Sequence, residues 1–338
     1  MNNCIGLDIS KSTINVHIPK CSLDLEIENS KKDIKSLFSK LKKIYKKEID
    51  NLIFIYEPTG SYSYWITQFC ALKEIQVFMV NPKQSHNFAK AIGQRGKSDK
   101  VDAKMLSLCK SIAREGEIRV PVINKVEQEI KELISYYKFT TKQRVQASNH
   151  LESIQIKDGS VYAIKDLEKE IKNFRLKEKA VIVKIKEIIK NDTILDSKFT
   201  NIKSIIGVGD VAAIALIHLF IKYPKANQRE IVSLSGLDPV ERTSGSSIRG
   251  KSRISKAGSR LYRGSLFMSA MVAIRYNDEI KQFYDRLKNN GKHTTVAQVA
   301  VMKKMIVIAH SLYKKSCDYD AVFYQKQCGK CEEIALVA

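Results

Sequence analysis

Two short, continuous apolar runs at 51–56 (NLIFIY) and 75–80 limit the possible folds more than any other feature of the sequence. Runs of this kind are typical of strands that are buried on both faces. The second run ends at Asn81-Pro82, which is a turn signal. Helical patterns at about 31–46 and 62–73 alternate with these runs. The sequence therefore predicts a mixed α/β domain over residues 1 to about 115.

Two further β-prone runs lie at 4–9 and 13–18, with Ser10-Lys11-Ser12 between them, and predict a β-hairpin. With a third strand before the first helix, the predicted order is three strands, helix, strand, helix and strand. This is the order of an RNase H-like domain, but several other α/β folds share it. Topology alone therefore does not decide the fold.

The chain changes character at about 122–192. Apolar residues recur at helical spacing on both sides of an Asp158-Gly159-Ser160 turn: Val126, Ile130, Leu133 and Tyr137 before it, and Ile164, Leu167, Ile171 and Phe174 after it. We expect an antiparallel helical hairpin or coiled coil, and either a plain linker or a dimerisation arm fits this pattern.

A second, mainly α domain is predicted from about 200 onward. Within it, 202–220 resembles a helix-hairpin-helix, in which turn amides and a helix N-terminus hold a DNA phosphate. The domain boundaries that we predict are 1–118, 119–195 and 196–338.

The charge balance points to a polyanionic partner. The sequence has 58 basic and 36 acidic side chains, a formal net charge of +22. A surplus of this size attracts nucleic acid. A ribosome-associated or merely lysine-rich protein would show the same balance.

Neither a membrane nor an exported location is expected. The most apolar run, 211–221, is interrupted by His218 and is shorter than the ~20 residues that span a bilayer. The N-terminus has no secretory pattern, and seven mostly scattered cysteines fit a reducing cytoplasm. Cys328 and Cys331 form a CxxC that has no second pair for a zinc site.

Four carboxylates are expected to meet in the first domain. Asp8 lies in the first predicted strand, and we place it on the face opposite Gly6. Glu57 directly follows the run at 51–56, and Asp99 and Asp102 follow a predicted N-cap at Ser98. Clustered carboxylates need a cation, and oxygen ligands favour Mg²⁺ or Mn²⁺. Two such ions about 4 Å apart can promote phosphoryl transfer. A helix N-terminus stabilised by Asp99 and Asp102, and a cap at Glu57, are the simpler interpretations.

The segments GLDISK, YEPTGSY and KSDKVDAK, in this order and spacing, resemble the motifs of the insertion-sequence-110 family of transposases, which includes Piv-type DNA invertases. The resemblance implies a RuvC-like N-terminal domain of RNase H-like fold, a coiled-coil middle and a C-terminal transposase domain. It also implies that Asp8, Glu57, Asp99 and Asp102 form a metal-binding catalytic tetrad.

The segment LSGLDPVERTSG at 234–245 resembles the family's C-terminal domain, whose serine nucleophile corresponds to Ser244. From the residues alone, Thr243, Ser246 and Ser247 compete with it. Six cations without a counter-charge follow on a predicted loop that leads into a helix: Arg249, Lys251, Arg253, Lys256, Arg260 and Arg263. Together with Arg95, Lys97 and Lys100, they are the candidate nucleic-acid ligands.

Tyr62, Tyr64 and Trp65 have a helical spacing that fits core packing or base stacking, and we favour core packing. The six histidines form no recognisable ligand pattern.

The family resemblance implies a transposase or recombinase that cleaves and rejoins donor and target DNA through a covalent serine intermediate. It further implies a structured noncoding guide, the bridge RNA, a homo-oligomer (dimer or tetramer), and a place at the nucleoid in a prokaryotic cytoplasm. Three alternatives stay open: a RuvC-like hydrolytic junction nuclease, an actin-like sugar kinase, and a non-catalytic nucleic-acid-binding protein.

Overall fold

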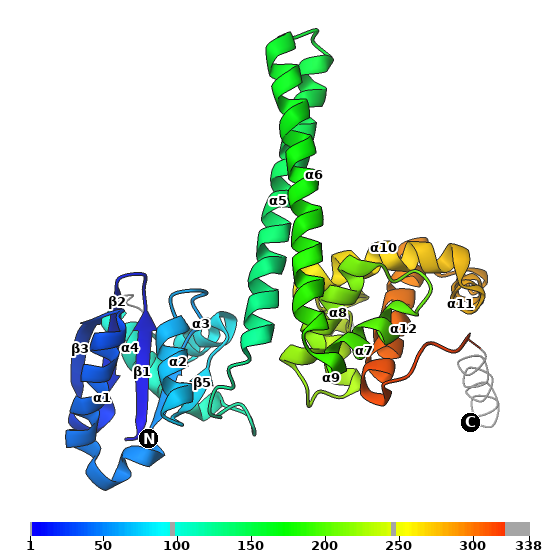
Figure 1. Cartoon of the computed structure of the whole chain (residues 1–338). Helices are drawn as coiled ribbons and strands as arrows, with labels where there is room; N and C mark the ends of the chain where they lie inside the picture. Colours follow the sequence, from blue (N-terminus) through cyan, green and yellow to red (C-terminus); the bar gives the residue numbers. More distant parts are fainter. Residues whose placement is uncertain (1, 95–98, 245–247, 322–338) are drawn as a thin grey trace, which may run out of the picture. The chain divides into compact units, whose positions relative to one another are not determined.

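The computed structural model describes residues 2–94, 99–244 and 248–321 of the 338-residue chain (Figure 1). The chain divides into two compact units, Met1–Asn124 and Lys125–Ala338, which are described one at a time.

The first unit contains a five-stranded mixed sheet in the order β3-β2-β1-β4-β5. Its strands are β1 (Cys4–Ile9), β2 (Thr13–Ile18), β3 (Leu23–Glu28), β4 (Ile53–Tyr56) and β5 (Gln76–Met79). The first three strands are antiparallel, whereas β1, β4 and β5 are parallel. The predicted hairpin and both predicted buried strands are confirmed, and so is the predicted order of strands and helices.

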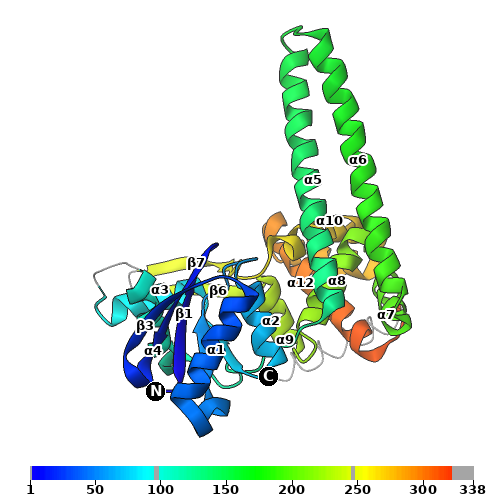
Figure 2. The ribbon, with the colours of Figure 1, turned by 60° about the vertical axis from the view of Figure 1, so that its left-hand side comes forward.

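Helices cover both faces of this sheet (Figure 2). Helices α1 (Lys31–Tyr45) and α2 (Tyr64–Leu72) pack on the face formed by Ile5 and Leu7 of β1. Helices α3 (Pro82–Ala91) and α4 (Asp99–Leu108) pack on the other face, against Cys4 and residues of β4 and β5. Three short 3₁₀ helices complete the unit: η1 (Pro19–Cys21), η2 (Lys46–Asn51) and η3 (Cys109–Ile112).

The prediction that Asp8 and Gly6 lie on opposite faces of β1 is wrong. Residues two apart in a strand point to the same face, and Cys4, which shares their phase, lies in the core cluster with α4. A Cβ at Gly6 would lie 1.9 Å from the carbonyl oxygen of Ala103 in α4. Gly6 therefore lets α4 approach β1 closely on the face that also carries Asp8.

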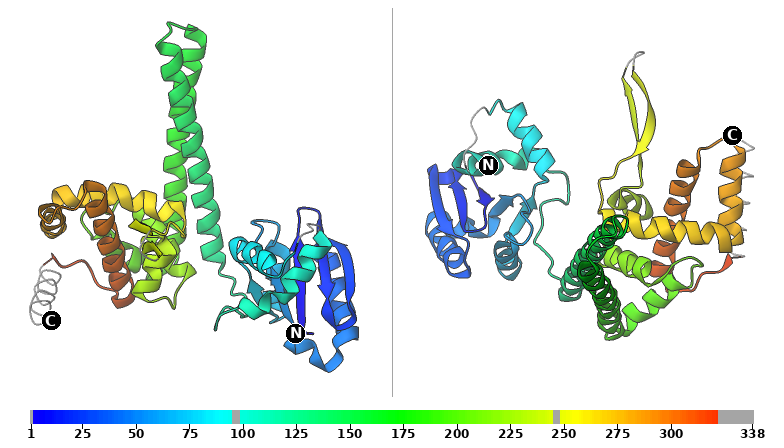
Figure 3. Two further views of the ribbon diagram at one scale, coloured as in Figure 1. Left: turned by 180° about the vertical axis from the view of Figure 1, so that it is seen from behind. Right: turned by 90° about the horizontal axis from the view of Figure 1, so that it is seen from above.

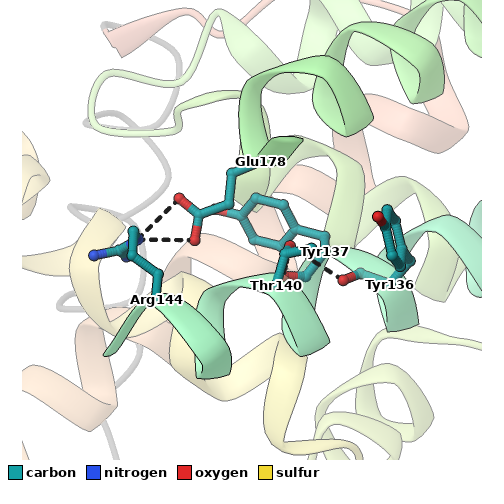
Figure 4. Close-up of polar contacts among 5 residues, drawn as sticks. All are labelled: Tyr136, Tyr137, Thr140, Arg144 and Glu178. Carbon is teal, nitrogen blue, oxygen red and sulfur yellow. Dashed lines mark hydrogen bonds and ion pairs between the residues drawn. The ribbon is translucent and has the colours of Figure 1, made fainter. Parts of the chain in front are cut away.

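The second unit begins with a long antiparallel helical hairpin, α5 (Lys125–Gln155) and α6 (Val161–Lys190), as the sequence predicts (Figure 1). Its two helices are held in register by an ion pair in which Arg144 Nε donates to both oxygens of Glu178, at 3.0 and 3.1 Å. Figure 4 shows this pair beside Tyr137, with the Thr140 hydroxyl donating to the carbonyl of Tyr136. Both charged side chains are largely buried, so the ion pair fixes the pairing of the helices.

The rest of the second unit is a helical core (Figure 3). Its helices are α7 (Thr193–Lys203), α8 (Asp210–Lys222), α9 (Gln228–Ser235), α10 (Arg260–Tyr276), α11 (Asp278–Asn289) and α12 (Thr294–Lys315). Of the helices that the structure describes, α12 alone is long and apolar enough to cross a membrane. Its apolar residues pack in the hydrophobic core, as do those of α8, which contains the apolar run noted in the sequence.

Two strands, β6 (Pro239–Ser244) and β7 (Ile248–Ile254), form an antiparallel hairpin that projects from this helical core (Figure 3, right). A loop was predicted here from the sequence, and that prediction is wrong. The segment lacks the alternating apolar residues by which strands are recognised, because most of its side chains are polar or charged.

The fit between Gly6 and α4 can be tested by adding one methyl group. We expect Gly6→Ala to destabilise the first unit by about 3 kcal/mol, because the new Cβ cannot be accommodated without displacing α4. Urea unfolding followed by fluorescence measures this unit specifically, since Trp65 is the only tryptophan of the chain.

Gly116→Ala is the matched control, because a Cβ there meets no atom within 4 Å. The φ of Gly116 is +78°, so this variant should lose only the ~1 kcal/mol of a left-handed alanine. Equal losses in the two variants would contradict the close packing of α4 on β1.

Candidate active site

Two carboxylates lie at the ends of neighbouring parallel strands. Leu7 of β1 pairs with Tyr56 of β4. Asp8 follows Leu7 and Glu57 follows Tyr56, so these two carboxylates are neighbours at the carboxyl edge of the sheet. Asp8 lies on the α4 side, as described above. Glu57 accepts a hydrogen bond from Ser85 Oγ of α3, which covers the same face. Strand pairing thus brings together two residues that are 49 positions apart.

The other two carboxylates come from the first turn of α4. Asp99 and Asp102 are three residues apart there, as predicted, and α4 packs directly on β1. Ser98, the predicted cap, lies outside the described residues, as do Arg95 and Lys97. Lys100 is exposed in the same turn.

The electrostatics of Asp8 show that the four carboxylates share one environment. Burial, as the largest cause, and the charges of Asp99, Asp102 and Glu57 together raise the pKa of Asp8 from 3.8 to about 6. The other three members of the predicted tetrad therefore each raise the cost of ionising Asp8, which places negative charge at this edge of the sheet.

Two of these carboxylates are held by neutral partners that the sequence did not reveal. Ser85, which is fully buried, donates to Glu57, and Gln94 Nε2 donates to Asp102 Oδ1 at 3.0 Å. Neither residue belongs to a motif or a spacing that sequence analysis can use. Both orient a carboxylate of the cluster.

The cluster fits a hard divalent cation by its chemistry, since its side-chain donors are carboxylate oxygens that concentrate negative charge. Over residues 2–94, 99–244 and 248–321, no three His, Cys, Asp or Glu side chains are grouped closely enough to form a ligand set. Glu57 and Asp102 point instead at Ser85 and Gln94. Holding an ion therefore requires the carboxylates to move closer together than they lie here.

The second unit carries the other candidates. Ser244 is the last residue of β6, and its side chain is not among those described, nor are those of Arg249 and Lys251 on β7. Arg253, Lys256 and Arg260 are exposed along β7 and the segment that enters α10. These three cations are available to a phosphate backbone.

Arg263 differs from the other cations of this series. One nitrogen of its guanidinium donates to the carbonyls of Ser235 and Gly258, at 2.9 and 2.7 Å. The same nitrogen lies 2.5 Å from the position that a Cβ on Gly236 would take. Arg263 thus supports the chain around the β6–β7 hairpin from inside the unit.

The segment between α7 and α8 has the helix, turn and helix expected from the sequence. Gly207 has a φ of +99° and packs against Ala273 of α10. Asp210, in the first turn of α8, pairs with Lys186 at 3.1 Å and Lys203 at 2.5 Å, which lowers its pKa. This helix N-terminus therefore already has an anion of the chain itself.

Burial settles the expectation about the three aromatic residues after Glu57. Tyr62, Tyr64 and Trp65 are exposed, so the preference for core packing is wrong. The CxxC residues Cys328 and Cys331 lie outside the described part of the chain.

The sheet order and the carboxylates at its strand ends are typical of RNase H-like units, a class that acts on phosphodiester bonds. Comparison with known families agrees with this class. Residues 5–154 match the DEDD transposase family of IS110, and residues 200–285 match the transposase IS116/IS110/IS902 family. Together the matches cover more than half of the chain, which belongs to the insertion-sequence-110 (IS110) family of transposases.

Relatives support the same assignment. The pilin gene-inverting proteins of Moraxella bovis and Moraxella lacunata are each 25% identical to this chain over 279 residues, which is 80% of this chain and 82% of theirs. A protein of insertion element IS110 from Streptomyces coelicolor is 26% identical over 105 residues, 31% of this chain and 24% of that protein. The chain is a DNA transposase or recombinase, and its DEDD domain indicates dependence on a divalent metal.

The raised pKa of Asp8 gives a testable pH dependence. A carboxyl whose pKa is higher in the folded state stabilises the fold below pH ~4 and loses this contribution as the pH rises through about 6. Asp8→Asn should therefore stabilise the metal-free protein at pH 8 by about 1 kcal/mol, a value discounted because Asp8 is only half buried. At pH 4 the gain should vanish.

Urea unfolding in the presence of a chelator, followed by Trp65 fluorescence, measures both values. Asp50→Asn is the control, because Asp50 is exposed and lies before β4, at the opposite end of that strand from Glu57. A gain for Asp8→Asn that is the same at both pH values would contradict the charge cluster.

Proposed function

We propose that this transposase excises and inserts a mobile element by cutting and rejoining DNA through a covalent serine intermediate. The observation that carries the proposal is that Asp8 lies at an edge of the sheet where burial and the charges of Asp99, Asp102 and Glu57 all raise its pKa. A structural role alone would not favour four interacting carboxylates, since each one raises the cost of ionising Asp8.

Magnesium or manganese, as about two ions, would supply charge stabilisation for the scissile phosphate in this cluster. Asp8 and Glu57 would hold the metal from the strand ends, and Asp99 and Asp102 would hold it from α4. Ser85 and Gln94 would orient Glu57 and Asp102 in the metal-free protein and release them on binding.

Ser244 is the proposed nucleophile. Its oxygen would form a bond to phosphorus while the bond to one deoxyribose oxygen breaks, and the serine proton would pass to the leaving hydroxyl. The resulting phosphoserine ester keeps the energy of the phosphodiester, so a second DNA end can be joined without ATP. Arg253, Lys256 and Arg260, with Arg249 and Lys251 on β7, would bind the backbone near this serine. Arg95, Lys97 and Lys100 would do the same near the carboxylates.

Three functional parts follow from this mechanism: a RuvC-like catalytic part at 1–118, a helical connector at 119–195 and a transposase part with the nucleophile at 196–338. Donor and target DNA are the substrates. A structured noncoding RNA, the bridge RNA, would select them by pairing, and the net charge of +22 suits RNA as well as DNA. The reaction would take place at the nucleoid in the cytoplasm.

A homo-oligomer, either a dimer or a tetramer, would complete the site from more than one chain. The hairpin of α5 and α6 is the proposed contact. Tyr136 and Phe139 on α5 stack with their centroids 6.5 Å apart and are exposed. Leu176 and Val183 on α6 are exposed as well. Exposed aromatic and aliphatic residues on a long helical arm are suited to contact another copy.

The chemical step can be tested by a covalent-adduct assay. The protein, Mg²⁺, the flanking RNA of the element and a labelled junction duplex are incubated and separated under denaturing conditions. We expect a protein–DNA adduct that disappears in both Ser244→Ala and Asp102→Ala. Ser246→Ala and Ser247→Ala are the controls, since each removes a neighbouring hydroxyl and should leave the adduct.

Metal-dependent cutting without any adduct, unchanged in Ser244→Ala, would contradict the serine mechanism. In that case water would be the nucleophile, and the chain would act as a RuvC-like hydrolytic junction nuclease.

The oligomer contact can be tested by placing charge on the arm. We expect the double variant Phe139→Asp, Leu176→Asp to form a smaller assembly than the wild type, because burying a carboxylate without a partner is costly. Light scattering coupled to size exclusion measures the mass. Val122→Asp is the control, because Val122 is highly exposed and precedes the arm. An unchanged mass for the arm variant would place the contact elsewhere.

A further inference from the structure

Three aromatic side chains are exposed where the segment after β4 enters the first turn of α2. Tyr62, Tyr64 and Trp65 expose 45%, 40% and 39% of their surfaces. The rings of Tyr64 and Trp65 meet edge to face, with centroids 4.8 Å apart. We call these three residues the aromatic platform. Exposed aromatic residues grouped in this way offer π faces to a ligand.

The platform is exposed because its neighbours take the inward positions. Ser63 and Ile66 are buried, and the Ser63 hydroxyl donates to the carbonyl of Gly60 at 3.2 Å. Thr67 donates to the carbonyl of Ser63 at 2.7 Å and is hydrogen-bonded to the Tyr56 hydroxyl. These contacts fix the rotation of α2, so the intervening aromatic residues must face outward.

The platform lies at the carboxyl edge of the sheet. Its segment starts directly at Glu57, and Asn29 Nδ2 donates to the carbonyls of both Ser10 and Tyr62, each at 2.9 Å. Ser10 follows β1, the strand that carries Asp8. The platform is therefore held at the same edge of the sheet as Asp8 and Glu57. It lies beside the face that α1 and α2 cover, whereas the two carboxylates lie on the face that α3 and α4 cover.

Cations accompany the aromatic rings. Lys31 Nζ lies 3.9 Å from the centroid of the Trp65 ring, and Lys31 itself is exposed. Lys11, in the turn after β1, is exposed as well. Aromatic rings beside lysine ammonium groups are complementary to a ligand in which flat apolar groups alternate with negative charges. A single strand of nucleic acid has this composition, with bases for the rings and phosphates for the lysines.

We propose that the aromatic platform binds single-stranded DNA by stacking unpaired bases of the strand that reaches the carboxylate site. The occupant is a single strand because the bases of a duplex are already stacked on one another and have no free π face. This inference rests on the proposed DNA-cleaving function, since it proposes that the same unit also binds the DNA strand to be cut.

Trp65 is the only tryptophan, so its fluorescence reports on the platform alone. The full chain is titrated with an oligothymidylate of about ten nucleotides, a length within the usual site sizes for single strands. A chelator is present throughout, so binding is measured without cutting. We expect the oligonucleotide to quench Trp65 fluorescence in step with the anisotropy of a label on the DNA. A duplex of equal length should bind without this quenching.

Variants then separate stacking from general charge attraction. Trp65→Ala should weaken single-strand binding about 10-fold, as expected for the loss of one stacked base, and Trp65→Phe should restore most of it. Tyr162→Ala is the control, because Tyr162 is more exposed than any platform residue but lies on α6. It should bind like the wild type.

Several results would overturn the proposal: unchanged fluorescence at saturating DNA, equal quenching by the duplex, quenching by an RNA oligonucleotide but not by DNA, or equal affinity of Trp65→Ala and the wild type. None of these bears on the adduct assay, which needs metal and tests cleavage. A protein that forms the adduct but shows no quenching would therefore refute the platform and not the proposed function.

Discussion

The close packing of α4 on β1 is the contact on which the acidic site depends. Glycine at position 6 leaves no side chain between the strand and the helix, and a methyl group would collide with the backbone of α4. The first turn of α4 therefore brings Asp99 and Asp102 to the strand end that carries Asp8. Parallel pairing of β1 with β4 adds Glu57. One small residue and one strand register thus gather carboxylates from three separate parts of the chain.

Placing the four carboxylates together makes the ionisation of Asp8 unfavourable, which suits a site that binds a cation. Burial and three neighbouring carboxylates raise the pKa of Asp8 to about 6, so the metal-free site opposes its own ionisation near neutral pH. A divalent cation would remove that opposition. Ser85 and Gln94 each offer a neutral hydrogen bond to one carboxylate, which limits the repulsion until a cation is present. The fold thereby sacrifices some stability to keep these oxygens together, as functional sites commonly do.

Much of this organisation could be predicted from the sequence, because strong apolar periodicity sets the strands of the first unit and the helices of the arm. The carboxylates were found because they directly follow or lie in such elements. Three features were not predictable in this way. The side chains of β6 and β7 are too polar for strand periodicity. The exposure of Tyr64 and Trp65 depends on how Ser63 and Ile66 anchor α2, and Ser85 and Gln94 reach the cluster only through tertiary packing.

The central claim is that the four carboxylates hold a divalent metal, and electron paramagnetic resonance of Mn²⁺ tests it most directly. Free Mn²⁺ gives a signal that decreases on binding, so titration of the full chain gives affinity and stoichiometry. We expect about two bound ions per chain, with binding lost in Asp102→Asn and kept in Asp166→Asn, which removes an exposed carboxylate of the arm. Equal Mn²⁺ binding by the Asp102→Asn variant and the wild type, or no binding by either, would contradict it.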